Sequence, residues 1–174
     1  MKDTLISRRE FLKDIGMIGA GVLLSASPWL SAFSEVVETS GEKCRLAIIG
    51  PGSRGRFLMS FLVQNPKVEI VALCDIYQPS IEKALELAPK AKVYDDYREI
   101  LEDKTVDAVL VATPLNSHCQ IVLDAFDAGK HVFCEKSIGF TMEECFRIYN
   151  KHISTEKVFF TGQQRLFDPR YIKA

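Results

Sequence analysis

Apolar and polar residues alternate along positions 43–162 in blocks that predict strands and helices in strict succession. Short apolar runs, typical of buried strands, fall at 46–49, 69–74, 93–94, 107–112, 131–134 and 158–160. Between them, apolar residues three and four positions apart predict helices at 54–64, 79–88, 95–102, 118–128 and 141–151. Strands that alternate with helices predict an α/β fold, with six strands in a doubly wound parallel sheet and helices on both faces.

Two helix boundaries carry their own signals. Thr141 and Glu144 are spaced as in a capping box, which predicts a helix start at this point. Gly129 follows the helix predicted at 118–128 and is suited to end it.

The first 34 residues have a different pattern. Residues 7–13, Ser-Arg-Arg-Glu-Phe-Leu-Lys, precede an uncharged, mostly apolar run at 15–34, as in a signal peptide. The basic segment resembles the twin-arginine export motif, so we expect passage through the twin-arginine export machinery to the periplasm or beyond. An amphipathic N-terminal helix is the alternative. If uncleaved, the apolar run approaches the ~20 residues that cross a bilayer and would anchor the protein there. Residues 35–42 are polar and predict a linker.

Charge and cysteine content narrow the class of partner. The chain has 174 residues, with 22 basic and 23 acidic side chains interspersed and a net charge of −1. This balance argues against a nucleic-acid partner and favours a small molecule. The five cysteines include no C-x-x-C pair, so we expect small buried side chains, with no metal site and no disulfide framework.

The first predicted strand and helix are joined by a glycine-rich loop. Residues 50–55 fit the pattern G-x-G-x-x-G, in which the glycines allow a tight turn, close approach of a pyrophosphate, and packing of helix on strand. Backbone N–H groups and the positive helix end then bind the anion. We therefore predict a Rossmann domain whose cofactor contacts include Gly50, Gly52, Ser53, Arg54 and Gly55. A loop that merely needs flexible glycines is the alternative.

Asp75 ends the second predicted strand, at the distance from the glycines expected of a ribose-binding carboxylate. A 2′-phosphate ~4 Å from this carboxylate would be repelled by about 4 kcal/mol at an effective dielectric constant of ~20. Asp75 therefore favours NAD over NADP. NADP stays possible because Arg54 is within reach of a phosphate, and Asp75 has the alternative role of a strand-end or capping carboxylate.

Three later segments resemble motifs of one known family. They are residues 112–118 (Ala-Thr-Pro-Leu-Asn-Ser-His), 135–137 (Glu-Lys-Ser) and 162–169 (Gly-Gln-Gln-Arg-Leu-Phe-Asp-Pro). With the glycine loop, they resemble the glucose-fructose oxidoreductase, inositol dehydrogenase and MocA family, Gfo/Idh/MocA, from about Arg45 to the C-terminus. Leu115 interrupts the usual first motif, and Ser137 replaces the usual proline of the second.

The resemblance implies roles for individual residues. Lys136 would lie near the nicotinamide and stabilise alkoxide character on the substrate hydroxyl, which makes it the catalytic candidate. The other implied cofactor contacts are Thr113, Pro114, Asn116, His118, Glu135 and Arg165. For His118 the alternative is a helix-start residue, for Glu135 and Lys136 a solvated surface pair, and for Arg165 a structural ion pair.

The family has a second domain, which residues 163–174 would only begin to enter. We therefore expect a fragment that binds the dinucleotide but catalyses poorly, with homo-oligomers forming through the second domain. The resemblance implies an exported NAD(P)-dependent oxidoreductase acting on a sugar or polyol. The alternatives are an NAD-dependent glycoside hydrolase of the same family and a non-catalytic dinucleotide-binding protein.

Overall fold

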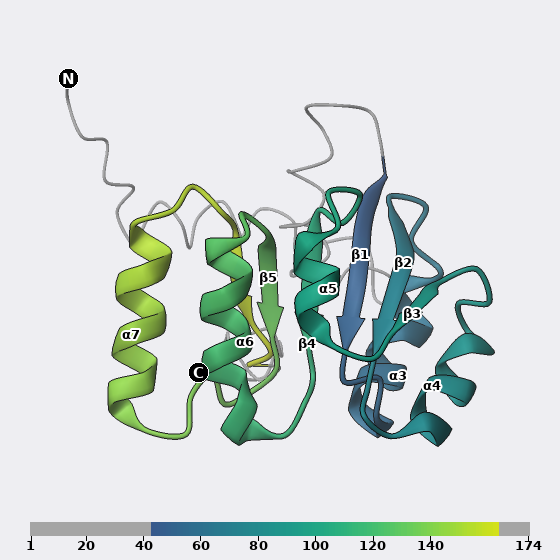
Figure 1. The fold of residues 1–174 in the computed structure, drawn as a ribbon, viewed down its shortest axis with the longest axis horizontal. Helices are drawn as coiled ribbons and strands as arrows, with labels where there is room; N and C mark the ends of the chain where they lie inside the picture. Colours follow the sequence, from purple (N-terminus) through teal and green to yellow (C-terminus); the bar gives the residue numbers. More distant parts are fainter. Residues whose placement is uncertain (1–42, 164–174) are drawn as a thin grey trace, which may run out of the picture.

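Six parallel strands form one sheet in the computed structural model, which describes residues 43–163 (Figure 1). The strands are β1 Cys44–Ile49, β2 Val68–Cys74, β3 Lys92–Tyr94, β4 Ala108–Val111, β5 His131–Cys134 and β6 Phe159–Thr161. Their order in the sheet is β3-β2-β1-β4-β5-β6, so the direction of winding reverses between β1 and β4. This strand order confirms the predicted doubly wound Rossmann sheet. In such sheets the reversal of winding leaves a crevice at the carboxyl ends of the strands.

Helices cover both faces of the sheet, as predicted. They are α3 Ser53–Leu62, α4 Gln78–Leu85, α5 Tyr97–Glu102, α6 Leu115–Asp127 and α7 Met142–Ile153. One core packs α3 and α4 against one face of the sheet, and a second core packs α5, α6 and α7 against the other. All four residues of β4 are fully buried, since both of its faces are covered.

Helices α5 and α6 begin at residues other than the predicted ones, because an N-cap residue sets the start of each. Helix α6 begins at Leu115 because Pro114 serves as its N-cap with a φ of −58°, so residues 115–117 are helical although they lack apolar periodicity. Helix α5 begins at Tyr97, because the Asp96 side chain accepts a hydrogen bond from the Arg98 N–H and caps it. At α7 the predicted capping box is confirmed, with both the Thr141 and the Glu144 hydrogen bonds present.

Other predictions concern cysteines, metals and the chain ends. Four of the cysteines are buried and Cys145 is half-buried, and none is in a disulfide within residues 43–163. The same range has no group of three potential metal ligands and no helix long and apolar enough to cross a membrane. The predicted signal peptide, the linker at 35–42 and Arg165 lie outside the described residues.

Candidate functional site

The candidate residues lie together because parallel strands bring their carboxyl ends to one edge of the sheet. Gly50 follows β1, Asp75 follows β2, Thr113 lies just beyond β4, and Glu135 follows β5. The strand ladders continue into these loops: the Gly50 N–H donates to Cys74 O at 2.8 Å and the Glu135 N–H to Val111 O at 2.9 Å. Ligands of open α/β sheets bind at such an edge, at the reversal of strand order.

The three glycines of the loop have different surroundings. Gly50 has a φ of +86°, and a Cβ there would lie 2.7 Å from the Thr113 backbone N. A Cβ on Gly55 would lie 2.5 Å from the Gly50 carbonyl oxygen. At Gly52, by contrast, a Cβ would have no atom within 4 Å. Gly50 and Gly55 are therefore required by packing within the protein, and Gly52 borders open space.

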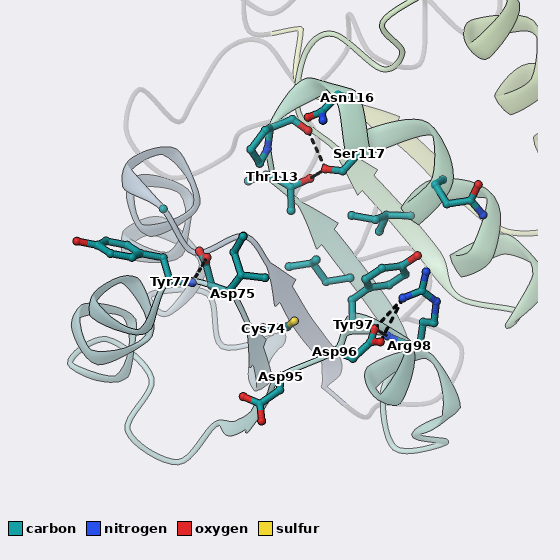
Figure 2. Close-up of a pocket in the computed structure, with 18 residues that line it drawn as sticks. Cys74, Asp75, Tyr77, Asp95, Asp96, Tyr97, Arg98, Thr113, Asn116 and Ser117 are labelled. Atoms are coloured by element: carbon teal, nitrogen blue, oxygen red, sulfur yellow. Dashed lines mark hydrogen bonds and ion pairs between the residues drawn. The ribbon is translucent and has the colours of Figure 1, made fainter.

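A cavity of about 950 Å³ lies beside this loop. Of the predicted cofactor contacts, it is lined by Gly50, Gly52, Asp75, Thr113, Pro114 and Asn116. In Figure 2, Asp75 and Tyr77 follow the end of β2, with the Tyr77 ring turned away from the other lining side chains, and Thr113, Asn116 and Ser117 lie around the start of α6. The Ser117 Oγ lies 2.8 Å from Thr113 Oγ1, which joins two of the lining side chains.

Acidic side chains dominate the charge at one end of the cavity. Asp75 is half-buried, and its Oδ1 accepts the Tyr77 N–H at 2.9 Å. Asp95 and Asp96 also line the cavity, and within residues 43–163 the only cation that lines it is Arg98. Arg98 is paired with Asp96 at 3.2 Å, and hydrogen bonds from Arg98 hold the pKa of Asp96 below its usual range. The lining therefore favours neutral hydroxyls over a further anion at this end.

Sequence reasoning missed the residues that follow β3. Asp95, Asp96, Tyr97 and Arg98 all line the cavity, but they belong to no recognised motif. The available signal was topological, because every strand of a parallel sheet delivers the residues after its carboxyl end to the ligand edge.

Arg54 and Glu135 lie outside this cavity and contact each other. Arg54 Nε donates to Glu135 Oε1 at 2.7 Å, and only 6% of the Glu135 side chain is exposed. The second oxygen, Oε2, accepts the Lys136 N–H at 3.1 Å. The guanidinium predicted to reach a phosphate thus neutralises a nearly buried carboxylate and links the glycine loop to the end of β5.

Lys136 and Ser137 are exposed at the edge where β5 ends. Neither residue lines the cavity described above, and the peptide bond between them is cis. Lys136 therefore lies outside the cavity, in the loop that follows β5.

His118, predicted as a cofactor contact, is only 2% exposed. It lies in the first turn of α6, where its Nδ1 is 2.7 Å from Ser137 O and its Nε2 is 2.8 Å from Thr113 O. Both ring nitrogens are therefore occupied by backbone carbonyls. The ring does not line the cavity, and it joins the loops that follow β4 and β5.

Comparison with known proteins agrees with this geometry. Residues 44–163 match the family described as GFO_IDH_MocA, oxidoreductase family, NAD-binding Rossmann fold. The chain belongs to the Gfo/Idh/MocA family. Its cofactor class is therefore NAD(P), which is consistent with the glycine loop and the cavity beside it.

Relatives within this family have different reactions in their names. A glycosyl hydrolase family 109 protein from Stenotrophomonas maltophilia is 34% identical over 162 residues, covering 86% of this chain and 34% of the relative. An alpha-N-acetylgalactosaminidase from Shewanella oneidensis is 31% identical, covering 87% of this chain and 38% of the relative. Against these curated relatives, the chain spans little more than a third of their length.

A solved structure is similar over the same part. The myo-inositol dehydrogenase of Lactobacillus casei, in complex with NAD(H) and myo-inositol, has 33% identity and a TM-score of 0.69. The match covers 73% of this chain and 38% of the dehydrogenase.

Proposed function

We propose that this chain is the NAD-binding part of an exported oxidoreductase that acts on a sugar or polyol. The observation that carries the proposal is the glycine loop and Asp75 facing one cavity at the reversal of strand order, in a chain of the Gfo/Idh/MocA family. The similar myo-inositol dehydrogenase binds NAD(H) and a polyol, which supports the substrate class.

The preferred cofactor is NAD. The ribose hydroxyls of the dinucleotide would donate to Asp75, whereas a 2′-phosphate would meet the carboxylates of Asp75, Asp95 and Asp96. A like charge ~4 Å from one carboxylate costs about 4 kcal/mol at a dielectric constant of ~20, and solvent screening reduces this at an open site. Arg98 offsets little of this cost because it is already paired with Asp96.

Replacing the ribose-binding carboxylate tests this preference. In Asp75→Ala we expect the affinity for NAD to fall about tenfold, because a charge-assisted hydrogen bond to the ribose is lost. The ratio of NAD affinity to NADP affinity should also fall, because the repulsion of the 2′-phosphate is lost. Calorimetric titration with each dinucleotide measures both. The control is Glu82→Ala, which removes an exposed carboxylate of α4 that does not line the cavity. An unchanged affinity ratio in Asp75→Ala contradicts the assignment.

Lys136 is the proposed catalytic residue. The first mononucleotide half of the sheet, β1 to β3, borders the acidic end of the cavity, so the reactive end of the dinucleotide is expected over β4 and β5, where Lys136 lies. The Lys136 ammonium would donate a hydrogen bond to the substrate hydroxyl and stabilise the negative charge that develops on its oxygen. A bound dinucleotide would accept the hydride, and the hydroxyl proton would pass to water in the open site.

Two experiments test the proposal. NAD should raise the melting temperature of the chain, and at 100 times its Kd the stabilisation should be about 2.7 kcal/mol. If folded protein shows no shift with saturating NAD, the binding proposal fails. For the full-length protein, incubation with sugars and polyols should give net reduction of NAD, and Lys136→Met should abolish it without weakening NAD binding.

A glycoside hydrolase that retains NAD is the second candidate. Its support is the names of the relatives, since the similar proteins from Stenotrophomonas and Shewanella are described as glycosidases. In such a reaction the substrate hydroxyl would be oxidised, the leaving group eliminated together with a proton from the neighbouring carbon, water added across the resulting double bond, and the hydride returned, so that the dinucleotide would end unchanged. Glycoside cleavage without net NAD reduction would favour this candidate. No turnover in either assay would favour a binding protein.

Export is proposed from residues 7–13, because the sequence Ser-Arg-Arg-Glu-Phe-Leu-Lys has the spacing of a twin-arginine signal. Changing Arg8 and Arg9 to lysine should leave the protein in the cytoplasm, as measured by cell fractionation. Wild-type protein that stays in the cytoplasm contradicts the proposal. Gel filtration of the full-length protein tests the expected homo-oligomer.

A further inference from the structure

The buried ring of His118 connects two loops at the ligand edge of the sheet. Its Nε2 lies 2.8 Å from Thr113 O, just beyond β4, and its Nδ1 lies 2.7 Å from Ser137 O, just beyond β5. With 2% of the residue exposed, the ring is inaccessible to a ligand. A side chain expected to touch the cofactor is thus engaged wholly with the protein backbone.

Hydrogen bonding by the His118 ring can hold the two loops together, and we call this link between Thr113 and Ser137 the His118 tether. A carbonyl oxygen only accepts, so each of the two hydrogen bonds needs an N–H on the ring. The neutral ring has one N–H and makes one bond, and the doubly protonated ring makes both. In either state the ring fills the space between the loops, and at least one loop is held by a hydrogen bond shielded from water.

The segment that His118 holds includes the proposed catalytic lysine. On one side of that residue, the Lys136 N–H donates to Glu135 Oε2 at 3.1 Å, and the Glu135 carboxylate is itself held by Arg54. On the other side, the carbonyl of the next residue, Ser137, is held by His118. The exposed Lys136 side chain therefore extends from a backbone that is fixed both before and after it.

We propose that His118 is a positioning residue, which holds the Lys136–Ser137 segment against the first turn of α6. It thereby sets the place of the Lys136 ammonium relative to Thr113 at the cavity. The effect on turnover rests on the proposed function of Lys136, whereas the tether itself does not.

The tether is tested by hydrogen exchange on the 174-residue chain, in wild type and in His118→Met and His118→Gln. Methionine fills similar space and donates nothing, and glutamine keeps one N–H donor group. The measured amides are those of Lys136 and Phe140, whose N–H groups are bonded to Glu135 and Glu144. The matched control is His152→Gln, because His152 also contacts a backbone carbonyl, that of Lys157, at the other end of α7.

In His118→Met we expect exchange at Lys136 and Phe140 to accelerate about tenfold, as the loss of one or two hydrogen bonds allows. The amides of β1 and β2 should keep their wild-type rates. His118→Gln should lie between methionine and wild type, and His152→Gln should leave both amides unchanged. Unchanged rates at these amides in His118→Met, or acceleration spread evenly over the whole sheet, would overturn the tether.

The full-length enzyme separates positioning from folding. His118→Met should lower kcat at least tenfold, leave the Kd for NAD within twofold of wild type, and regain activity in part as His118→Gln. A Kd that rises as steeply as kcat falls would assign His118 to cofactor binding and overturn the positioning role. If NAD does not bind the wild-type chain, the proposed function fails, while the exchange result still decides the tether.

Discussion

Replacing two glycines of the same loop by alanine should affect different properties: Gly55→Ala the stability, and Gly52→Ala the affinity for NAD. In Gly55→Ala the new Cβ meets the Gly50 carbonyl oxygen at 2.5 Å, and a backbone atom cannot rotate away as a side chain can. Overpacking of this kind costs about 1–3 kcal/mol or more. The helical preference of alanine returns up to ~1 kcal/mol, so the clash outweighs it. Because the backbone oxygen cannot yield, the clash belongs in the upper part of that range, about 2–3 kcal/mol. We therefore expect a net loss of about 1–2 kcal/mol, or roughly 5–10 °C in Tm for a domain of this size.

Gly52→Ala should behave differently. Its φ of −63° and ψ of −163° suit alanine, and the new Cβ has no neighbour within 4 Å, so stability should stay within about 1 kcal/mol of wild type. The open space is where a pyrophosphate would approach, so the affinity for NAD should fall at least about tenfold. Thermal melts with and without NAD measure both quantities. If apo Gly52→Ala is as unstable as Gly55→Ala, or keeps the full NAD-induced shift, the assignment of roles is wrong.

Two further predictions concern the Arg54–Glu135 ion pair and the buried thiol of Cys134. Arg54→Met should lower the free energy of unfolding by about 2 kcal/mol, because it removes the cation beside the nearly buried Glu135 carboxylate. Urea denaturation measures this free energy. The control is Arg56→Met, which removes a hydrogen bond to the Pro51 carbonyl and should cost ~1 kcal/mol or less. Equal losses of unfolding free energy in the two variants would refute the argument. Burial raises the pKa of the Cys134 thiol to about 12, so iodoacetamide at pH 8 should label half-buried Cys145 well before Cys134. Mass spectrometry reports the order of labelling, and the reverse order would contradict it.

The fold was predictable because its signals are local. Apolar runs bounded by turn residues marked all six strands, and the spacing of Thr141 and Glu144 marked a helix start that the structure contains. The start of α6 was missed by three positions, because Pro114 caps the helix before its apolar residues begin to repeat.

The site was predictable only in part, because its decisive contacts are not local. Arg54 and Glu135 are 81 positions apart, and only the sheet order brings them within 2.7 Å. His118 has the sequence context of a cofactor contact, and its burial depends on the path of the loop after β5. Asp75 was identifiable because β1 and β2 are neighbouring parallel strands joined through the single helix α3, so their carboxyl ends lie side by side.

The close approach of Gly162 to Glu135 has a mechanical consequence. Gly162 follows β6, its N–H donates to Cys134 O at 2.8 Å, and a Cβ on it would lie within 2.9 Å of both Glu135 carboxylate oxygens. A shift of Gly162 toward or away from the sheet would thus press on or release that carboxylate. From there it would spread to Arg54 in the glycine loop and to the Lys136 backbone. A displacement of Gly162 would therefore reach the glycine loop and the Lys136 backbone through one carboxylate.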